Sequence, residues 1–277
     1  MSTRLLYLPG NIVSLLVGWL AHLRLPSALL RRVIRVYCAF YRIDPSSCTR
    51  SLSEFASLAD FFVREMKPEL RPVNGPLVSP VDGVLRDFGS LDSGELSHIK
   101  GRRYSVEELL QSSSQARLFR QGFYLNFYLS PADCHHVFCP LAGEVFESVY
   151  IPGGLLPVND FTFRRVSRLF CLNERLVTYI RSDIGTVALV MVGAMCVGQM
   201  GVTYDSWRTN TPRSFLDSGG AQVRDYQQAI RYAAGQKLGT FCLGSSVVLL
   251  FERKPEGLGK RLAPGMRLYY GSALVDV

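Results

Sequence analysis

The 277-residue sequence lacks the short motifs that mark several large enzyme classes. It contains no GxSxG, so a hydrolase with a nucleophile elbow is not expected. It contains neither GxGxxG nor GxxxxGK(S/T), and "GLGK" at residues 257–260 lacks the first glycine of a P-loop. Internal repeats and low-complexity tracts are also absent. Any catalytic chemistry must therefore rest on other residues.

Cysteine and histidine are both sparse. The seven cysteines are odd in number, scattered and mostly set in apolar runs, at positions 38, 48, 134, 139, 171, 196 and 242. This usage predicts reduced thiols in a cytosolic setting and not a disulfide framework. No small-residue cleavage site follows the first apolar run, so no signal peptide is expected.

Charge is present in moderate amount and has an excess of one sign, with 31 Lys and Arg against 23 Asp and Glu. Hydrophobic residues make up 48% of the chain and charged residues 19%, which is typical of a globular protein. The formal net charge of +8 predicts an anionic partner, either nucleic acid or acidic lipid. No helix-turn-helix, zinc-finger or RNA-recognition signature accompanies the arginines, so nucleic acid is not the expected partner.

The first forty residues favour a membrane surface. The apolar run "IVSLLVGWLAHL" has 12 residues, whereas a spanning helix needs about 20. The next stretch, "SALLRRVIRVYCAFYRI", places aliphatic and aromatic residues at helical spacing and arginines between them. This pattern, with Trp19 upstream, is typical of a helix lying in a membrane interface. An ordinary amphipathic helix packed on its own core remains the alternative.

From about residue 77 the sequence is rich in β-strand signals. Short β-branched and aromatic runs alternate with Gly, Pro, Asn and Asp, as in "FYLNFYL", "GEVFESVYIPGG", "RLVTYI" and "SSVVLLFE". No βαβ alternation occurs. We therefore predict an α+β fold that is mostly β: an antiparallel, sandwich-like or barrel-like catalytic body with N-terminal amphipathic helices at the membrane surface. Residues 208–236 are expected to form a long loop with a short helix.

Three places could carry chemistry. His135 and His136 lie between two cysteines in "SPADCHHVFCP", but no second Cys/His group follows at zinc-ligand spacing, so no metal is expected. Neighbouring residues on a strand point to opposite faces, so at most one of the two histidines can reach a given cavity. Asp82 in "SPVDGVL" is either a turn residue or a functional carboxylate. The Gly244-Ser245-Ser246 step before an apolar strand suggests a bulge or a close backbone approach.

These places belong to a longer series of segments. In chain order they are "LADFFVREMKPELRPV", "SPVDGVL", "IKGRRYSVEELL", "YLSPADCHHVFCP", "IPGGLLPVN", "NERLV", "VGAMCVG" and "LGSSVVLLFE". Together they resemble the phosphatidylserine decarboxylase family over nearly the whole chain from about Leu30 onward. Each segment alone would be a weak signal, and their common order makes the resemblance specific.

The resemblance implies a proenzyme that cuts itself between Gly244 and Ser245. Ser245 Oγ would attack the Gly244 carbonyl to give an ester, and a glycine there leaves the carbonyl open to approach. Elimination and loss of ammonia would leave a pyruvoyl group in place of Ser245. This covalent cofactor would form a Schiff base with the amine of phosphatidylserine and accept electrons as CO2 leaves, giving phosphatidylethanolamine.

The same resemblance implies roles for the other candidates. Asp82 would orient a histidine that acts as general base for self-cleavage, and His135 would assist decarboxylation or protonation of the product. The expected product is two segments, residues 1–244 and 245–277, in a homodimer of processed chains. The expected partners are phosphatidylserine and an anionic membrane surface, with no nucleic acid. Residues 1–60 would associate with the membrane and residues 61–277 would form the decarboxylase domain, at the cytoplasmic face of the cell membrane as a peripheral protein.

The histidine segment departs from the family pattern at two positions. Cys134 replaces a tyrosine, and Phe138 stands where the second histidine belongs, the one that should activate the serine. Two alternatives follow. His136 could substitute, because residues 136 and 138 share one face of a strand about 6.5 to 7 Å apart. Otherwise the chain is an uncut, catalytically impaired homologue that binds anionic phospholipid.

Overall fold

The computed structural model describes residues 8–92, 94–99, 102–158, 162, 165–166, 168–195, 199–210, 220–242 and 246–276. Only the first two helices are long. The helical elements are α1 (Leu8–Ala21), α2 (Ser27–Tyr41), η2 (Pro45–Ser47), α3 (Leu58–Phe62), η3 (Pro68–Leu70), α4 (Val106–Leu110), α5 (Ser113–Leu118) and α7 (Leu169–Leu172). The strands are β1 (Gly83–Asp92), β2 (Glu95–Ile99), β3 (Arg102–Ser105), β4 (Phe123–Tyr128), β5 (His136–Phe138), β6 (Gly143–Ile151), β7 (Arg175–Ser182), β8 (Gly185–Val192), β9 (Met200–Val202), β10 (Gln222–Tyr232), β11 (Lys237–Phe241), β12 (Ser246–Phe251) and β13 (Arg267–Leu268).

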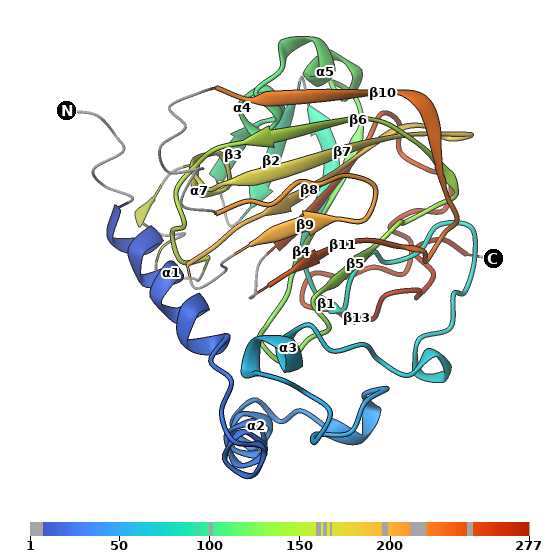
Figure 1. Cartoon of the computed structure of the whole chain (residues 1–277). Helices are drawn as coiled ribbons and strands as arrows, with labels where there is room; N and C mark the ends of the chain where they lie inside the picture. Colours follow the sequence, from blue (N-terminus) through green and yellow to red (C-terminus); the bar gives the residue numbers. More distant parts are fainter. Residues whose placement is uncertain are drawn as a thin grey trace.

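A ten-stranded antiparallel sheet forms most of the body (Figure 1). Its strand order is β10-β6-β7-β8-β12-β4-β1-β2-β3, and β13 pairs with β1. The strand β12 lies inside this sheet between β8 and β4, and all six of its residues are buried. Because both faces of β12 are covered, its sequence is a nearly continuous apolar run. A half-exposed strand would instead alternate apolar and polar residues. The predicted mostly β, antiparallel α+β fold is confirmed.

A second sheet of three strands, β5-β11-β9, holds the histidine segment. The strand β11 lies in its centre and pairs antiparallel with both neighbours, Thr240 opposite His136 on one side and opposite Gly201 on the other. The chain leaves β11 at Phe241 and enters β12 at Ser246. The segment with the predicted cleavage point therefore joins the small sheet to the large one.

The helices α1 and α2 lie together at one side of the body, at the lower left of Figure 1. Leu30, Ile34 and Cys38 of α2 are buried at a spacing of four residues, which is the repeat of one helix face. They belong to a small hydrophobic core of their own, with Cys48, Phe55 and Phe61. Among the described helices, none combines the length and the apolar character needed to cross a bilayer.

The prediction for residues 208–236 was wrong in part. Gln222–Tyr232 form β10, an 11-residue edge strand that pairs with β6. Most of its residues are exposed or half-buried, so an apolar alternation is missing and the polar composition resembles that of a loop. Residues 211–219, which include part of the predicted loop, lie outside the described residues.

Candidate active site

A cavity of about 810 Å³ opens beside the small sheet. It is lined by polar and charged residues together with a few apolar ones: Arg50, Val63, Glu65, His136, Gln199, Gly201, Val202, Thr203, Asp205, Arg208, Lys237, Thr240 and Cys242. Cys242 is the last described residue before Ser246. The predicted residues Gly244 and Ser245 lie outside the described residues, and the chain enters their segment from the wall of this cavity.

His136 is the predicted site residue that lines the cavity. Its Nδ1 lies 3.0 Å from Thr240 Oγ1 and its Nε2 lies 3.4 Å from Lys237 Nζ. An ammonium group can only donate, so Nε2 is the acceptor and Nδ1 carries the proton that is donated to Thr240. Lys237 in turn pairs with Glu65 at 3.2 Å. The imidazole therefore presents its basic nitrogen toward a lysine that is itself paired with a carboxylate.

The surroundings of His136 keep its imidazole neutral. Burial and, to a lesser extent, the charge of Lys237 lower the pKa of His136 to about 4, although the charge of Glu65 opposes them. Burial dominates because only 4% of the residue is exposed, so the charged form loses most of its hydration. A neutral imidazole can accept a proton, which is the first requirement of a general base.

His135 lies in different surroundings, one residue before β5 begins. It is fully buried, its ring packs against Phe62 with centroids 4.0 Å apart, and its Nδ1 donates to the Asp133 carbonyl at 2.9 Å. The Nε2 atom is buried without a hydrogen-bond partner in the part of the chain that the structure describes. Burial and, to a lesser extent, the nearby charge of Arg64 lower the pKa of His135 to about 3.

Asp82 is held by an arginine that the sequence analysis did not single out. Arg71 Nε donates to Asp82 Oδ1 at 3.0 Å and Arg71 Nη2 donates to Oδ2 at 2.7 Å. The Tyr270 backbone N–H donates to Oδ1 at 2.9 Å. Within the described ranges, the hydrogen bonds of Asp82 run to these two residues and not to either histidine. The implied pairing of Asp82 with a histidine is therefore not the arrangement in this structure.

Phe138 lies between these two groups. Its ring stacks on Tyr270 with centroids 3.8 Å apart and planes 14° apart, and it meets His136 edge-on at 6.4 Å. Tyr270 is also the residue whose backbone binds Asp82. The aromatic side chain thus lies between His136 and the residue whose backbone binds Asp82.

Sequence reasoning missed Arg71, Lys237, Thr240 and Arg208. Arg71 stands in "ELRPV" and the next two in "KLGTF", where nothing in composition or spacing separates them from ordinary surface residues. Their place in the site becomes visible only once strands are paired. For example, the register of β5 and β11 puts Thr240 opposite His136. Register of this kind is not encoded in a local pattern.

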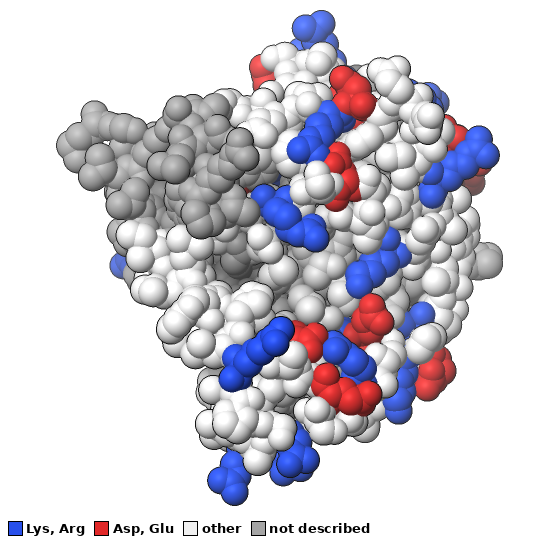
Figure 2. All heavy atoms as spheres, in the orientation of Figure 1, with Lys and Arg blue, Asp and Glu red and all other residues white. Residues whose placement is uncertain are grey.

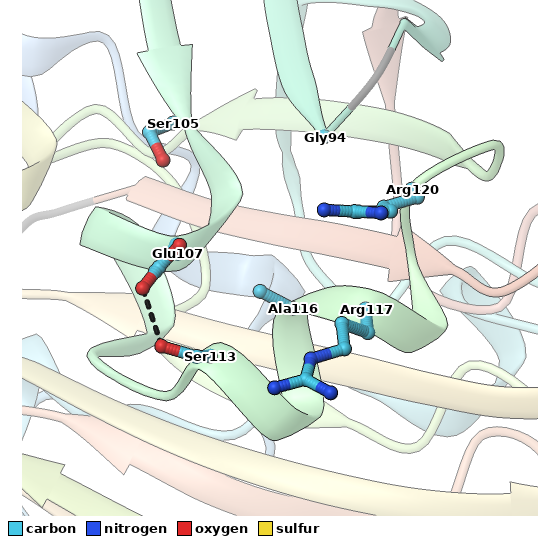
Figure 3. A pocket seen from close by; sticks show the side chains of 7 residues that line it. All are labelled: Gly94, Ser105, Glu107, Ser113, Ala116, Arg117 and Arg120. Atoms are coloured by element: carbon cyan, nitrogen blue, oxygen red, sulfur yellow. Dashed lines mark hydrogen bonds between the residues drawn. The ribbon is translucent and has the colours of Figure 1, made fainter.

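A second hollow lies far from these residues in the fold, at the helices α4 and α5 (Figure 3). Its volume is about 400 Å³, and Glu107 accepts a hydrogen bond from Ser113 at its wall. None of Asp82, His135 and His136 lines it. In the described part of the chain, no group of three or more His, Cys, Asp or Glu side chains is placed to hold a metal ion. The cavity beside β5 is therefore the candidate active site.

Comparison with known proteins places most of the chain in one family. The family model described as phosphatidylserine decarboxylase matches residues 58–276. A protein of Anaeromyxobacter sp. (strain K) named phosphatidylserine decarboxylase proenzyme is 38% identical over 270 residues, which cover 96% of this chain and 94% of the relative. Relatives of the same name from Myxococcus xanthus and Brevibacillus brevis are 38% and 37% identical, over 89% and 96% of this chain and 87% and 94% of their own. The chain belongs to the phosphatidylserine decarboxylase family.

Proposed function

We propose that this chain is the proenzyme of a pyruvoyl-dependent carboxy-lyase that converts phosphatidylserine to phosphatidylethanolamine and CO2 in phospholipid biosynthesis. The observation that carries the proposal is the cavity wall, where a neutral histidine lies beside the strand that leads into Gly244-Ser245. The family of the chain supplies the substrate class, because its relatives carry the name phosphatidylserine decarboxylase proenzyme.

His136 is proposed as the general base of self-cleavage. It would accept the proton of Ser245 Oγ as that oxygen attacks the Gly244 carbonyl, and the peptide bond would become an ester. Elimination would then release residues 1–244 with a free carboxylate and leave a dehydroalanine at residue 245, which hydrolyses to a pyruvoyl group and ammonia. Lys237 donates to His136 Nε2 in the uncut chain, so it must release that nitrogen before the imidazole can take a proton.

The remaining candidates are proposed for other parts of the reaction. The pyruvoyl group would supply a ketone that takes the substrate amine and withdraws electrons as CO2 leaves. His135 is proposed from the family resemblance for proton transfer at the substrate carbon, and its Nε2 is buried without a partner in the described structure. Asp82 is proposed to hold Tyr270 and, through the stacked ring of Tyr270, the side chain of Phe138 at the end of β5, instead of orienting a base.

Intact mass spectrometry of the purified protein tests self-cleavage. Cleavage yields a C-terminal fragment of residues 245–277 whose blocked N-terminus has the mass of a pyruvoyl group. A Ser245→Ala variant is the matched control, because it lacks the attacking oxygen and must stay uncut. A wild-type chain that remains intact after long incubation would contradict the proposal and favour an uncut lipid-binding protein.

A peripheral position at the cytoplasmic face of the cell membrane is proposed for α1 and α2. One face of α2 is buried in the small core with Cys48, Phe55 and Phe61, so the core-helix alternative accounts for that face. Other apolar side chains of the two helices face solvent, among them Trp19 at 64%, Val36 at 71% and Phe40 at 77% exposed. In Figure 2 the lower left of the molecule, where these helices lie, is mostly uncharged with Lys and Arg at its lowest edge. Apolar side chains flanked by cations suit a surface of anionic lipid.

Flotation with liposomes of anionic phospholipid tests this position. Changing Trp19, Val36 and Phe40 together to serine should release the protein from the liposomes, since these side chains are exposed and their loss leaves the small core intact. Val223→Ser is the control, because Val223 is equally apolar and 56% exposed but lies on β10. Unchanged flotation of the triple variant would contradict membrane docking by these helices.

A division of labour between residues 1–60 and 61–277 is proposed on the same grounds. The small hydrophobic core of Leu30, Ile34, Cys38, Cys48, Phe55 and Phe61 is separate from the main core under the large sheet. A homodimer of processed chains is proposed from the family resemblance alone, and sedimentation equilibrium of the cleaved protein tests it.

A further inference from the structure

The charged side chains of the cavity are almost all neutralised by partners. Arg50 donates to both carboxylate oxygens of Asp60, at 2.8 and 3.2 Å. Lys237 pairs with Glu65, and Asp205 pairs with Arg224 and accepts from Tyr226. Side chains that are already paired with an opposite charge gain little binding energy from a charged group on a substrate.

Arg208 is the exception. Its Nη1 donates to the Trp207 carbonyl at 3.0 Å, and no carboxylate pairs with it among the residues that the structure describes. It is exposed at the cavity wall. Burial raises the pKa of the Cys242 thiol and the charge of Arg208 opposes that rise, so Arg208 acts electrostatically on the last described residue before the serine segment. A permanent positive charge thus remains available beside the predicted reaction centre.

The local structure holds Arg208 in this position. The buried residues on either side of it are fixed, since Trp207 Nε1 donates to Ser148 Oγ at 2.8 Å and Thr209 exchanges hydrogen bonds with Met200. The guanidinium lies over Gly201 of β9, where a Cβ atom would stand 2.5 Å from Arg208 Nη1. Any larger residue at position 201 would therefore displace the guanidinium.

We infer that Arg208 binds the phosphodiester of the phospholipid substrate. Phosphate and carboxylate are both anions that a guanidinium binds with two parallel hydrogen bonds. The carboxylate is the group that leaves as CO2, whereas the phosphodiester is retained in the product and continues toward the lipid chains outside the cavity. An exposed arginine at the cavity wall suits the group that stays near the opening. This inference rests on the proposed decarboxylase function and assigns Arg208 as a specificity residue of it.

The test uses the water-soluble lipids dihexanoyl-phosphatidylserine and dihexanoyl-phosphatidylethanolamine, which remove any effect of membrane docking. Arg208→Gln should cleave itself as the wild type does, but its KM for the serine lipid and its inhibition constant for the ethanolamine lipid should each rise about tenfold. Gly201→Ala should raise both constants while keeping the charge, because its methyl group displaces the guanidinium. Arg231→Gln is the control for net charge, since Arg231 is 82% exposed and pairs with Glu144 on the large sheet.

Three results would overturn the inference. Unchanged constants in Arg208→Gln would show that Arg208 does not bind substrate. A raised KM for the serine lipid with an unchanged inhibition constant for the ethanolamine lipid would show that Arg208 binds the substrate carboxylate instead of the phosphodiester. An equal rise of KM and of the inhibition constant in Arg231→Gln would show that the effect of Arg208→Gln comes from the change in net charge alone. Titration calorimetry of dihexanoyl-phosphatidylethanolamine with the uncut Ser245→Ala chain, with and without Arg208→Gln, needs no self-cleavage, so failure of the proposed function is distinguished from failure of this inference.

Discussion

The two sides of Phe138 are built differently. On one side Asp82 is closed in by Arg71 and the Tyr270 backbone, with 3% of its side chain exposed. On the other side His136 faces an open cavity and is bound by a hydroxyl and a lysine that can rearrange. Of the residues expected to act as one triad, Asp82 is thus held in a buried ion pair, whereas His136, the base that we propose, lines the cavity. Mutations that act on one side only can test this division.

The largest expected effect is on the rigid side. Asp82→Ala, in an uncut Ser245→Ala background, should lower the free energy of unfolding by about 3–5 kcal/mol, because it leaves the Arg71 guanidinium poorly solvated and unpaired. Urea unfolding measures the change. Asp60→Ala is the matched control, since its pair with Arg50 is 28% and 38% exposed and should be worth less than about 1 kcal/mol. Equal losses in the two variants would refute a special role for the Asp82 pair.

Acid should destabilise the His136 side. The unfolded imidazole takes up a proton below a pKa of 6.5, whereas the folded one does so only near 4. The stabilisation is therefore fully present above pH 6.5 and is lost as the pH falls toward 4, and His136 should account for about 2–3 kcal/mol of the loss between pH 7 and pH 4.5. Unfolding of the uncut chain at both pH values, with and without His136→Gln, measures this share. An identical pH dependence in the two proteins would exclude it.

The histidines should separate kinetically. His136→Gln should slow self-cleavage by about a hundredfold, the usual scale for loss of a general base. His135→Gln should cleave at close to the normal rate and lose decarboxylation instead. A time course of fragment formation by mass spectrometry, followed by a CO2 assay of the cleaved material, distinguishes the two steps. Similar slowing of cleavage by both variants would show that the base is not assigned correctly.

The smallest expected effect comes from restoring the family residue between the two sides. Phe138→His places an imidazole against Tyr270 and near Asp82, and it should accelerate cleavage about severalfold if the missing base limits the rate. Phe138→Leu is the control, because it also breaks the aromatic stack but adds no base. An unchanged rate in Phe138→His would place the limiting step elsewhere, for example in the release of His136 by Lys237.

The fold was predictable from sequence where a strand is buried along most of its length. The runs that became β4, β7, β8 and β12 are buried along most of their length, so their apolar character identified them directly. The edge strand β10 was missed because it is mostly exposed and its strand character comes from pairing with β6. A local sequence pattern indicates whether a strand is buried, but it does not indicate which strand it pairs with.

Residues of the candidate site could be picked out from the sequence, but the hydrogen bonds and ion pairs between their side chains could not. The adjacent His135 and His136 differ in surroundings as expected, but His135 lies just before β5 and not within it, so strand alternation is not the reason. The bond between Asp82 and Arg71 joins residues 11 positions apart across a turn, and the bond between His136 and Lys237 joins residues 101 apart. Contacts of this kind depend on how sheets and loops pack, which a motif does not specify.

The place of β12 has a consequence for how the proposed enzyme is made. Ser246 to Phe251 pair along their whole length with β4 on one side and β8 on the other, and β13 in the same fragment pairs with β1. After a cut at Gly244-Ser245, a 33-residue peptide would remain threaded through the interior of the large sheet. The mature protein would then be a two-chain complex whose refolding is bimolecular, so its apparent stability would depend on concentration and the uncut chain would be the form able to fold unaided.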